Sequence, residues 1–78
     1  MNTDHYFMQR CRSLANTAAA KGESPVGAVI VKDDKLISEG MEAGKSKNDI
    51  TCHAEIEAIR LAVEKLNSND LSDYVLYT

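Results

Sequence analysis

The amino-acid sequence predicts an α/β protein in which helices pack on a β-sheet. Two segments, 4–20 and 52–66, carry apolar residues at helical spacing, and between and after them lie short apolar runs typical of strands. The order helix, β-hairpin, helix, strand indicates layers, because each helix has to bury its apolar stripe against the sheet. The chain has no internal repeat, low-complexity tract or linker, so we expect a single unit over residues 1–78.

The first helix begins near Thr3 or Asp4, either of which can cap it, and runs to about Ala20. Gly22 is well placed to end it. Its apolar residues recur every three or four positions and form a narrow stripe, made of Phe7, Cys11, Leu14, Ala15 and Ala18.

Two strands follow. Residues 26–31 are apolar without alternation, which is typical of a strand covered on both faces. Asp33 and Asp34 supply a turn, and residues 35–40 return as a second, antiparallel strand. A polar loop over 41–50 then leads to the second helix.

We expect Thr51 to cap the second helix, which ends near Leu66. Its expected buried stripe consists of Ile56, Ile59, Val63 and Leu66, widened by Ala58 and Ala62. Residues 74–78 are β-branched or aromatic and begin a third strand. Because the sequence stops there, we expect a fold truncated after the third strand, whose free edge invites pairing with a missing C-terminal half or a second copy.

Composition excludes several classes of protein. The net charge is -3 and the isoelectric point is near 5.2, which argues against a nucleic-acid partner. No apolar run has the length of a membrane span, and residues 1–10 lack the pattern of a signal peptide. Cys11 and Cys52 do not make a disulfide framework, so we expect reduced thiols and a cytoplasmic protein.

His53 and Glu55 lie in the first turn of the second helix and are the candidate chemical residues. A neutral imidazole is a good zinc ligand, and a carboxylate two residues later can exchange protons with a water on the same ion. Zinc lowers the pKa of such a water towards neutrality. The triplet by itself is a weak signal, because His-Ala-Glu at a helix start is more often a capping or surface feature.

The motif has a wider context: Pro25 to Val31, Gly40, Asp49, Thr51, the run His53-Ala54-Glu55, and Leu76-Tyr77-Thr78. In this order and spacing the chain resembles the N-terminal half of the zinc-dependent cytidine deaminase-like superfamily, in the branch of nucleobase, nucleoside and tRNA-adenosine deaminases. The resemblance implies a partial three-layer α/β/α fold.

The resemblance also implies roles for individual residues. His53 matches the zinc ligand and Glu55 the proton-shuttling glutamate, while Val29, Ala54 and Glu42 match substrate-binding positions. The family's two cysteine ligands, in P-C-x-x-C, have no counterpart in this sequence. Cys11 and Cys52 do not fit that role, and we expect both to serve in packing. Since a catalytic zinc takes three protein ligands, the site is expected to be incomplete in these residues.

Glu42 departs from the family pattern. It stands eleven residues before His53, where relatives commonly carry an asparagine that holds the base or ribose. An amide donates and accepts hydrogen bonds, whereas an ionised carboxylate only accepts. Glu42 would therefore select substrates that present donors. The alternative interpretation is a solvated acid in a loop.

The resemblance predicts the N-terminal fragment of a zinc-dependent hydrolytic deaminase that acts on a nucleobase or nucleoside of the guanine, cytosine or adenine type. Two alternatives remain, a fragment of a tRNA adenosine deaminase and a non-catalytic module that serves in assembly. The acidic balance favours a small-molecule substrate over tRNA. The 78 residues alone are expected to be inactive.

Overall fold

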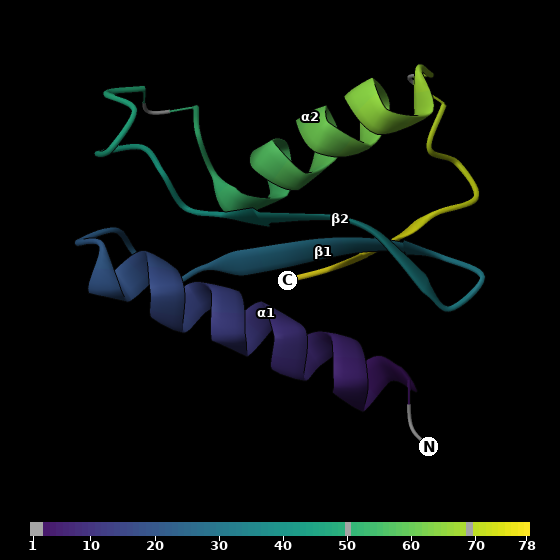
Figure 1. Ribbon diagram of the computed structural model, residues 1–78, viewed down its shortest axis with the longest axis horizontal. Coiled ribbons are helices and arrows are strands. Elements are labelled where there is room, and N and C mark those ends of the chain that lie inside the picture. Colours follow the sequence, from purple (N-terminus) through teal and green to yellow (C-terminus); the bar gives the residue numbers. More distant parts are fainter. Residues whose placement is uncertain (1–2, 50, 69) are drawn as a thin grey trace.

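The structure is a computed structural model that describes residues 3–49, 51–68 and 70–78. A three-stranded sheet lies between two helices, with α2 on one face and α1 on the other (Figure 1). This arrangement confirms the predicted partial three-layer α/β/α fold. The elements in chain order are α1 (Thr3–Ala20), β1 (Gly27–Lys32), β2 (Lys35–Met41), α2 (Ala54–Leu66) and β3 (Val75–Tyr77).

The sheet has the strand order β2-β1-β3, and β1 pairs antiparallel with both neighbours. The central position of β1 explains its unbroken apolar run. Val29 and Val31 pack against α1, while Ala28 and Ile30 pack against α2. The turn between β1 and β2 has positive φ at both Asp33 and Asp34, 51° and 60°. Aspartate tolerates this conformation, which matches the twist of a tight hairpin.

The contact between α2 and the sheet is unusually close. A Cβ atom added at Gly40 would lie 2.3 Å from the carbonyl oxygen of Ala54 and 2.5 Å from the amide nitrogen of Ala58. On the side of the helix that faces the sheet, three alanines are fully buried: Ala54, Ala58 and Ala62. The absence of larger side chains therefore allows the backbone of α2 to approach β2 directly.

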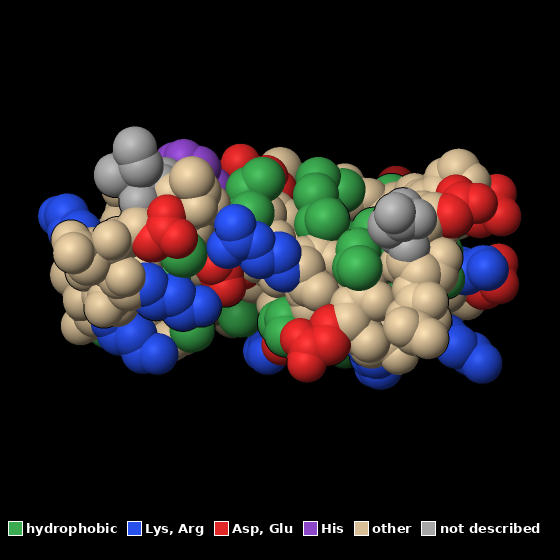
Figure 2. All heavy atoms as spheres, turned by 90° about the horizontal axis from the view of Figure 1, so that it is seen from above, with side chains coloured by type: hydrophobic (Ala, Val, Ile, Leu, Met, Phe, Trp, Pro, Cys, Tyr) green, Lys and Arg blue, Asp and Glu red, His purple; other side chains and the backbone are tan. Residues whose placement is uncertain are grey.

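This close contact corrects the predicted buried stripe of the second helix. Ile59 keeps 36% of its surface exposed, and the other large members, Ile56, Val63 and Leu66, are half-buried. The alanines that were expected only to widen the stripe form the contact instead, because larger side chains do not fit between helix and strand. Figure 2, which views the molecule from the α2 side, shows hydrophobic side chains left at the surface.

The last strand ties the two ends of the described chain together. The Tyr77 ring lies 5.3 Å from that of Phe7, and its hydroxyl group donates a hydrogen bond to Asp4 at 2.5 Å. The Cys11 thiol donates to the Tyr77 carbonyl oxygen at 3.3 Å. On its other side β3 has no strand partner within the described residues, and Leu76 is 44% exposed. None of the helices in the described ranges is long and apolar enough to cross a bilayer.

Candidate functional site

The site is built around the start of α2. His53 occupies the N-cap position with an extended backbone, φ -77° and ψ 155°, and its side chain makes no capping hydrogen bond. The prediction that Thr51 caps this helix is wrong, because His53 and not Thr51 holds the N-cap position, and the Thr51 hydroxyl group donates to the Asp49 carboxylate at 2.6 Å. The His53 ring is therefore not engaged by its own helix.

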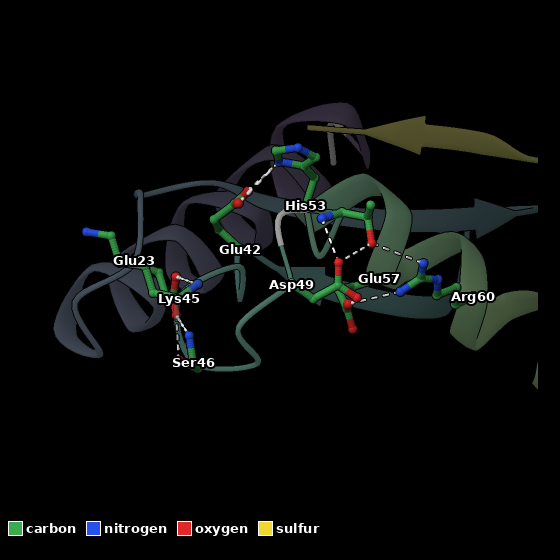
Figure 3. A network of polar contacts seen from close by, with 9 residues as sticks. Glu23, Glu42, Lys45, Ser46, Asp49, His53, Glu57 and Arg60 are labelled. Atoms are coloured by element: carbon green, nitrogen blue, oxygen red, sulfur yellow. Dashed lines mark hydrogen bonds and ion pairs between the residues drawn. The ribbon is translucent and has the colours of Figure 1, made fainter.

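Glu42 faces His53. The two carboxylate oxygens of Glu42 lie 3.2 and 3.3 Å from Nδ1 of His53, and Figure 3 shows the side chains pointing toward one another. The Glu42 side chain is only 14% exposed, compared with 55% for His53. These values argue against the interpretation of Glu42 as a solvated loop acid. The structure thus brings together two of the predicted site residues, which come from the end of β2 and the start of α2.

The loop between these residues is closed by backbone hydrogen bonds. The Ala43 amide donates to the Cys52 carbonyl oxygen at 2.9 Å, which joins the two ends of the loop. Further bonds inside 43–49 form a helical turn. The distance between Glu42 and His53 is consequently fixed by the backbone and not only by their side-chain contact.

A second polar cluster lies on the adjacent side of α2. Lys47 donates to Glu57 at 2.8 Å, and this hydrogen bond is the main reason why the pKa of Glu57 is lowered. Arg60 lies 3.7 Å from the same carboxylate (Figure 3). Cys52 is buried, and its hydrogen bond to Glu57 together with burial raises the pKa of its thiol. Cys52 therefore lies in a packed environment, as predicted.

Of the other predicted site residues, two lie at the start of α2 and one lies elsewhere. Glu55 lies in the first turn of α2 and is half-buried, and the fully buried Ala54 precedes it. The structure does not bring Val29 to this site. Its side chain is fully buried on the opposite face of the sheet, among Phe7, Cys11 and Leu14. The alternation of side chains along β1 accounts for this placement.

Glu23, which no sequence pattern marks as a site residue, is buried beside the loop. Its carboxylate accepts hydrogen bonds from the Lys45 amide, the Ser46 amide and the Ser46 hydroxyl. An acid shortly after a helix end is ordinarily solvated, so its position in the sequence carries no signal of this role.

The described side chains do not by themselves satisfy the ligand needs of a metal ion. Within residues 3–49, 51–68 and 70–78, no group of three or more His, Cys, Asp or Glu side chains is arranged to hold one. A catalytic zinc takes three protein ligands and keeps one open position. The described residues therefore do not make a complete zinc site, although the His53 imidazole is a suitable single ligand.

The fold and the position of His53-Ala54-Glu55 define a class of protein, the cytidine deaminase-like zinc proteins, in which this motif opens the helix after a β-hairpin. Comparison with known families agrees. The chain belongs to the family described as cytidine and deoxycytidylate deaminase zinc-binding region, whose model matches residues 1–78.

Individual proteins of known sequence show the same similarity. The chain is 44% identical to the guanine deaminase of Bacillus subtilis over 73 residues, covering 92% of this chain and 47% of that protein. It is 40% identical to the tRNA-specific adenosine deaminase of Aquifex aeolicus, covering 92% of this chain and 48% of that protein. The chain thus spans about half the length of the curated relatives it matches.

Solved structures give the same result in three dimensions. The Bacillus subtilis guanine deaminase superimposes with a TM-score of 0.88 at 42% identity, covering 94% of this chain and 47% of the other. A structure from work on tRNA:A34 deaminases gives a TM-score of 0.90 at 37% identity, covering 94% and 56%. A mutant of the protein NE0047, solved in complex with 8-azaguanine, gives a TM-score of 0.86 at 28% identity, covering 94% of this chain and 44% of the other.

Proposed function

We propose that this chain supplies the histidine and glutamate half of a zinc-dependent hydrolytic deaminase that acts on a nucleobase or nucleoside. The observation that carries the proposal is the geometry at the start of α2. There an imidazole not engaged by its own helix faces the largely buried carboxylate of Glu42. The 44% identity to a guanine deaminase supports the same class of substrate.

His53 is the proposed zinc ligand, and the remaining ligands come from residues outside these 78. When bound, zinc supplies a water of lowered pKa. Glu55 is the proposed general base and acid, whose carboxylate would accept a proton and deliver it to the substrate. Both residues lie at the N-terminus of α2, where the helix dipole favours negative charge that develops during the reaction.

Glu42 is the proposed specificity residue. Its contact with the His53 ring supports this role, because it places an acceptor beside the position assigned to the metal ligand. An ionised carboxylate accepts hydrogen bonds and donates none. Bases that present adjacent N–H groups, such as the ring N–H and amino group of guanine, fit it better than bases that present an acceptor there.

Two competing functions rest on separate observations. The TM-score of 0.90 with a structure from work on tRNA:A34 deaminases favours a tRNA substrate, while the net charge of -3 disfavours one. The apolar side chains exposed on α2 and β3 would suit a non-catalytic assembly module. Turnover of a free base by the full-length protein, without tRNA, separates the proposed function from both.

The proposed chemistry is tested in the full-length protein by Glu55→Gln, which should abolish turnover and leave zinc in place because it removes the proton carrier and no ligand. His53→Ala should lose the metal as well. Glu64→Gln is the matched control, since Glu64 is an exposed acid on the same helix and should keep wild-type activity. Wild-type turnover in Glu55→Gln would show that the assigned mechanism is wrong.

The proposed specificity is tested by kcat/KM ratios across guanine, cytosine, adenine and their nucleosides. A substrate without a matching donor leaves a desolvated carboxylate unpaired, so Glu42→Asn should change at least one ratio about tenfold or more. Glu42→Ala should weaken the preferred substrate selectively. Changes below about twofold in every ratio, or under ~0.5 kcal/mol, would remove Glu42 from the substrate site.

A further inference from the structure

We propose that Glu23 is a positioning residue that fixes the 43–49 turn and, through it, sets how well Glu42 is held for substrate binding. The inference rests on the proposed function for its effect on substrate affinity. Its structural part, the anchoring of the loop, stands on the hydrogen bonds of Glu23 alone.

Glu23 lies in the connection between α1 and β1 and is only 6% exposed. One carboxylate oxygen accepts the Lys45 amide at 2.9 Å. The other accepts the Ser46 amide at 2.6 Å and the Ser46 hydroxyl at 2.5 Å. Figure 3 shows the three side chains gathered at one end of the loop, apart from the pair formed by Glu42 and His53.

The Lys45 and Ser46 amides lie near the start of the helical turn over 43–49. The amides at the start of a helical turn have no partner within the turn, and an acid placed there both accepts their hydrogen bonds and complements their dipoles. Glu23 acts in this way from a segment 22 residues earlier in the chain. The bond from the Ser46 hydroxyl is the largest reason why the pKa of Glu23 is lowered, so the group is ionised at neutral pH.

The anchored turn connects directly to the substrate-facing residue. The Glu42 amide donates to the Val26 carbonyl oxygen at 3.1 Å, and the Ala43 amide donates to that of Cys52 at 2.9 Å. Glu42 is thus held by backbone bonds on both sides, while Glu23 holds the turn that follows. The Glu23 anchor is made by a side chain, so a substitution can remove it without altering the backbone.

Loosening this turn should act on binding more than on chemistry. The start of α2, which carries His53 and Glu55, is held by the buried contact of Ala54 with the sheet. Glu42 instead directly precedes the turn that the Glu23 carboxylate restrains. A less ordered Glu42 has more conformational freedom to lose when substrate binds, which weakens affinity.

The experiment compares Glu23→Gln and Ser46→Ala with the wild-type full-length protein. Asp70→Asn is the matched control, because Asp70 also accepts a serine amide and hydroxyl, those of Ser72, in a loop that is not part of the site. Amide exchange in 43–49 should accelerate about tenfold or more in Glu23→Gln, while exchange in β1 stays unchanged. Guanine serves as the substrate for KM and kcat.

In Glu23→Gln, KM for guanine should rise about fivefold or more, with kcat within about twofold and zinc content unchanged. Ser46→Ala should show the same pattern more weakly, and Asp70→Asn neither change. An unchanged KM, or a fall in kcat with loss of zinc, would overturn the positioning role. If Glu23→Gln unfolds β1, Ser46→Ala decides by the same criteria. If the wild-type protein deaminates none of the bases tested, the proposed function fails, while amide exchange still decides whether Glu23 anchors the turn.

Discussion

Gly40 controls how closely α2 approaches the sheet, and Gly40→Ala tests that geometry. The added methyl group would lie 2.3 Å from the Ala54 carbonyl oxygen and 2.5 Å from the Ala58 nitrogen. Both are backbone atoms, so no side chain can rotate away to make room. To bring the shorter contact to 3.0 Å, helix and strand have to separate by ~0.7 Å or more.

The expected loss of stability has two parts. Overpacking a tight contact of this kind costs about 1–3 kcal/mol. The separation also stretches the hydrogen bond from the buried Ser38 hydroxyl to the Ala58 carbonyl oxygen, 2.7 Å in the structure, which contributes about 1 kcal/mol. Gly40→Ala should therefore lower the free energy of unfolding by about 2–4 kcal/mol.

Urea unfolding of the full-length protein, followed by circular dichroism, measures this loss. Gly22→Ala is the control, because Gly22 has φ +82° and open space around the added methyl group. It should cost only about 1 kcal/mol through backbone strain. Equal destabilisation by the two substitutions would refute the inference that Gly40 is required for close packing of α2.

Two further predictions concern charge and exposed surface. The pKa of Glu57 is lowered in the folded state, chiefly by Lys47, so its contribution to stability is full above the unfolded value of about 4.3 and is lost as pH falls through the folded value. Urea unfolding over a pH series should show a steeper acid loss for the wild type than for Glu57→Gln, and parallel curves would contradict this. The isolated 78-residue chain should self-associate in sedimentation experiments, because Leu61 and Leu76 are 50% and 44% exposed and one edge of β3 has no strand partner among the described residues. A monodisperse monomer with protected β3 amides would be inconsistent with that expectation.

The order of elements was predictable from the sequence because each follows from a local pattern. The apolar run over 26–31 requires cover on both faces, and β1 lies at the centre of the sheet with a helix on each side. The face of α2 was not predictable in the same way. The hydrophobic pattern predicts that the larger Ile59 faces the sheet. The close approach of the helix to Gly40 instead places the smaller Ala58 in the contact.

Candidate site residues were predictable from the motif and its family pattern, whereas the contacts between them were not. His53 and Glu55 were identified from their spacing at a helix start, and their roles stay predictions. The contact between Glu42 and His53 depends on how the loop over 43–52 closes, and the role of Glu23 depends on a bond across 22 residues. Thr51 misled the capping prediction because the helix begins later, after His53 at the N-cap, and Thr51 lies in the preceding turn, where its hydroxyl group donates to Asp49.

The attachment of Tyr77 to α1 has a consequence for folding during synthesis. The β1–β2 hairpin joins neighbouring segments and can close early, whereas the contacts of Tyr77 with Phe7, Asp4 and Cys11 span most of the chain. Closing so long a loop is slow and entropically costly. On the ribosome, the N-terminal end of α1 therefore gains its contacts with Tyr77 only after β3 has been made, later than its packing on β1 becomes possible.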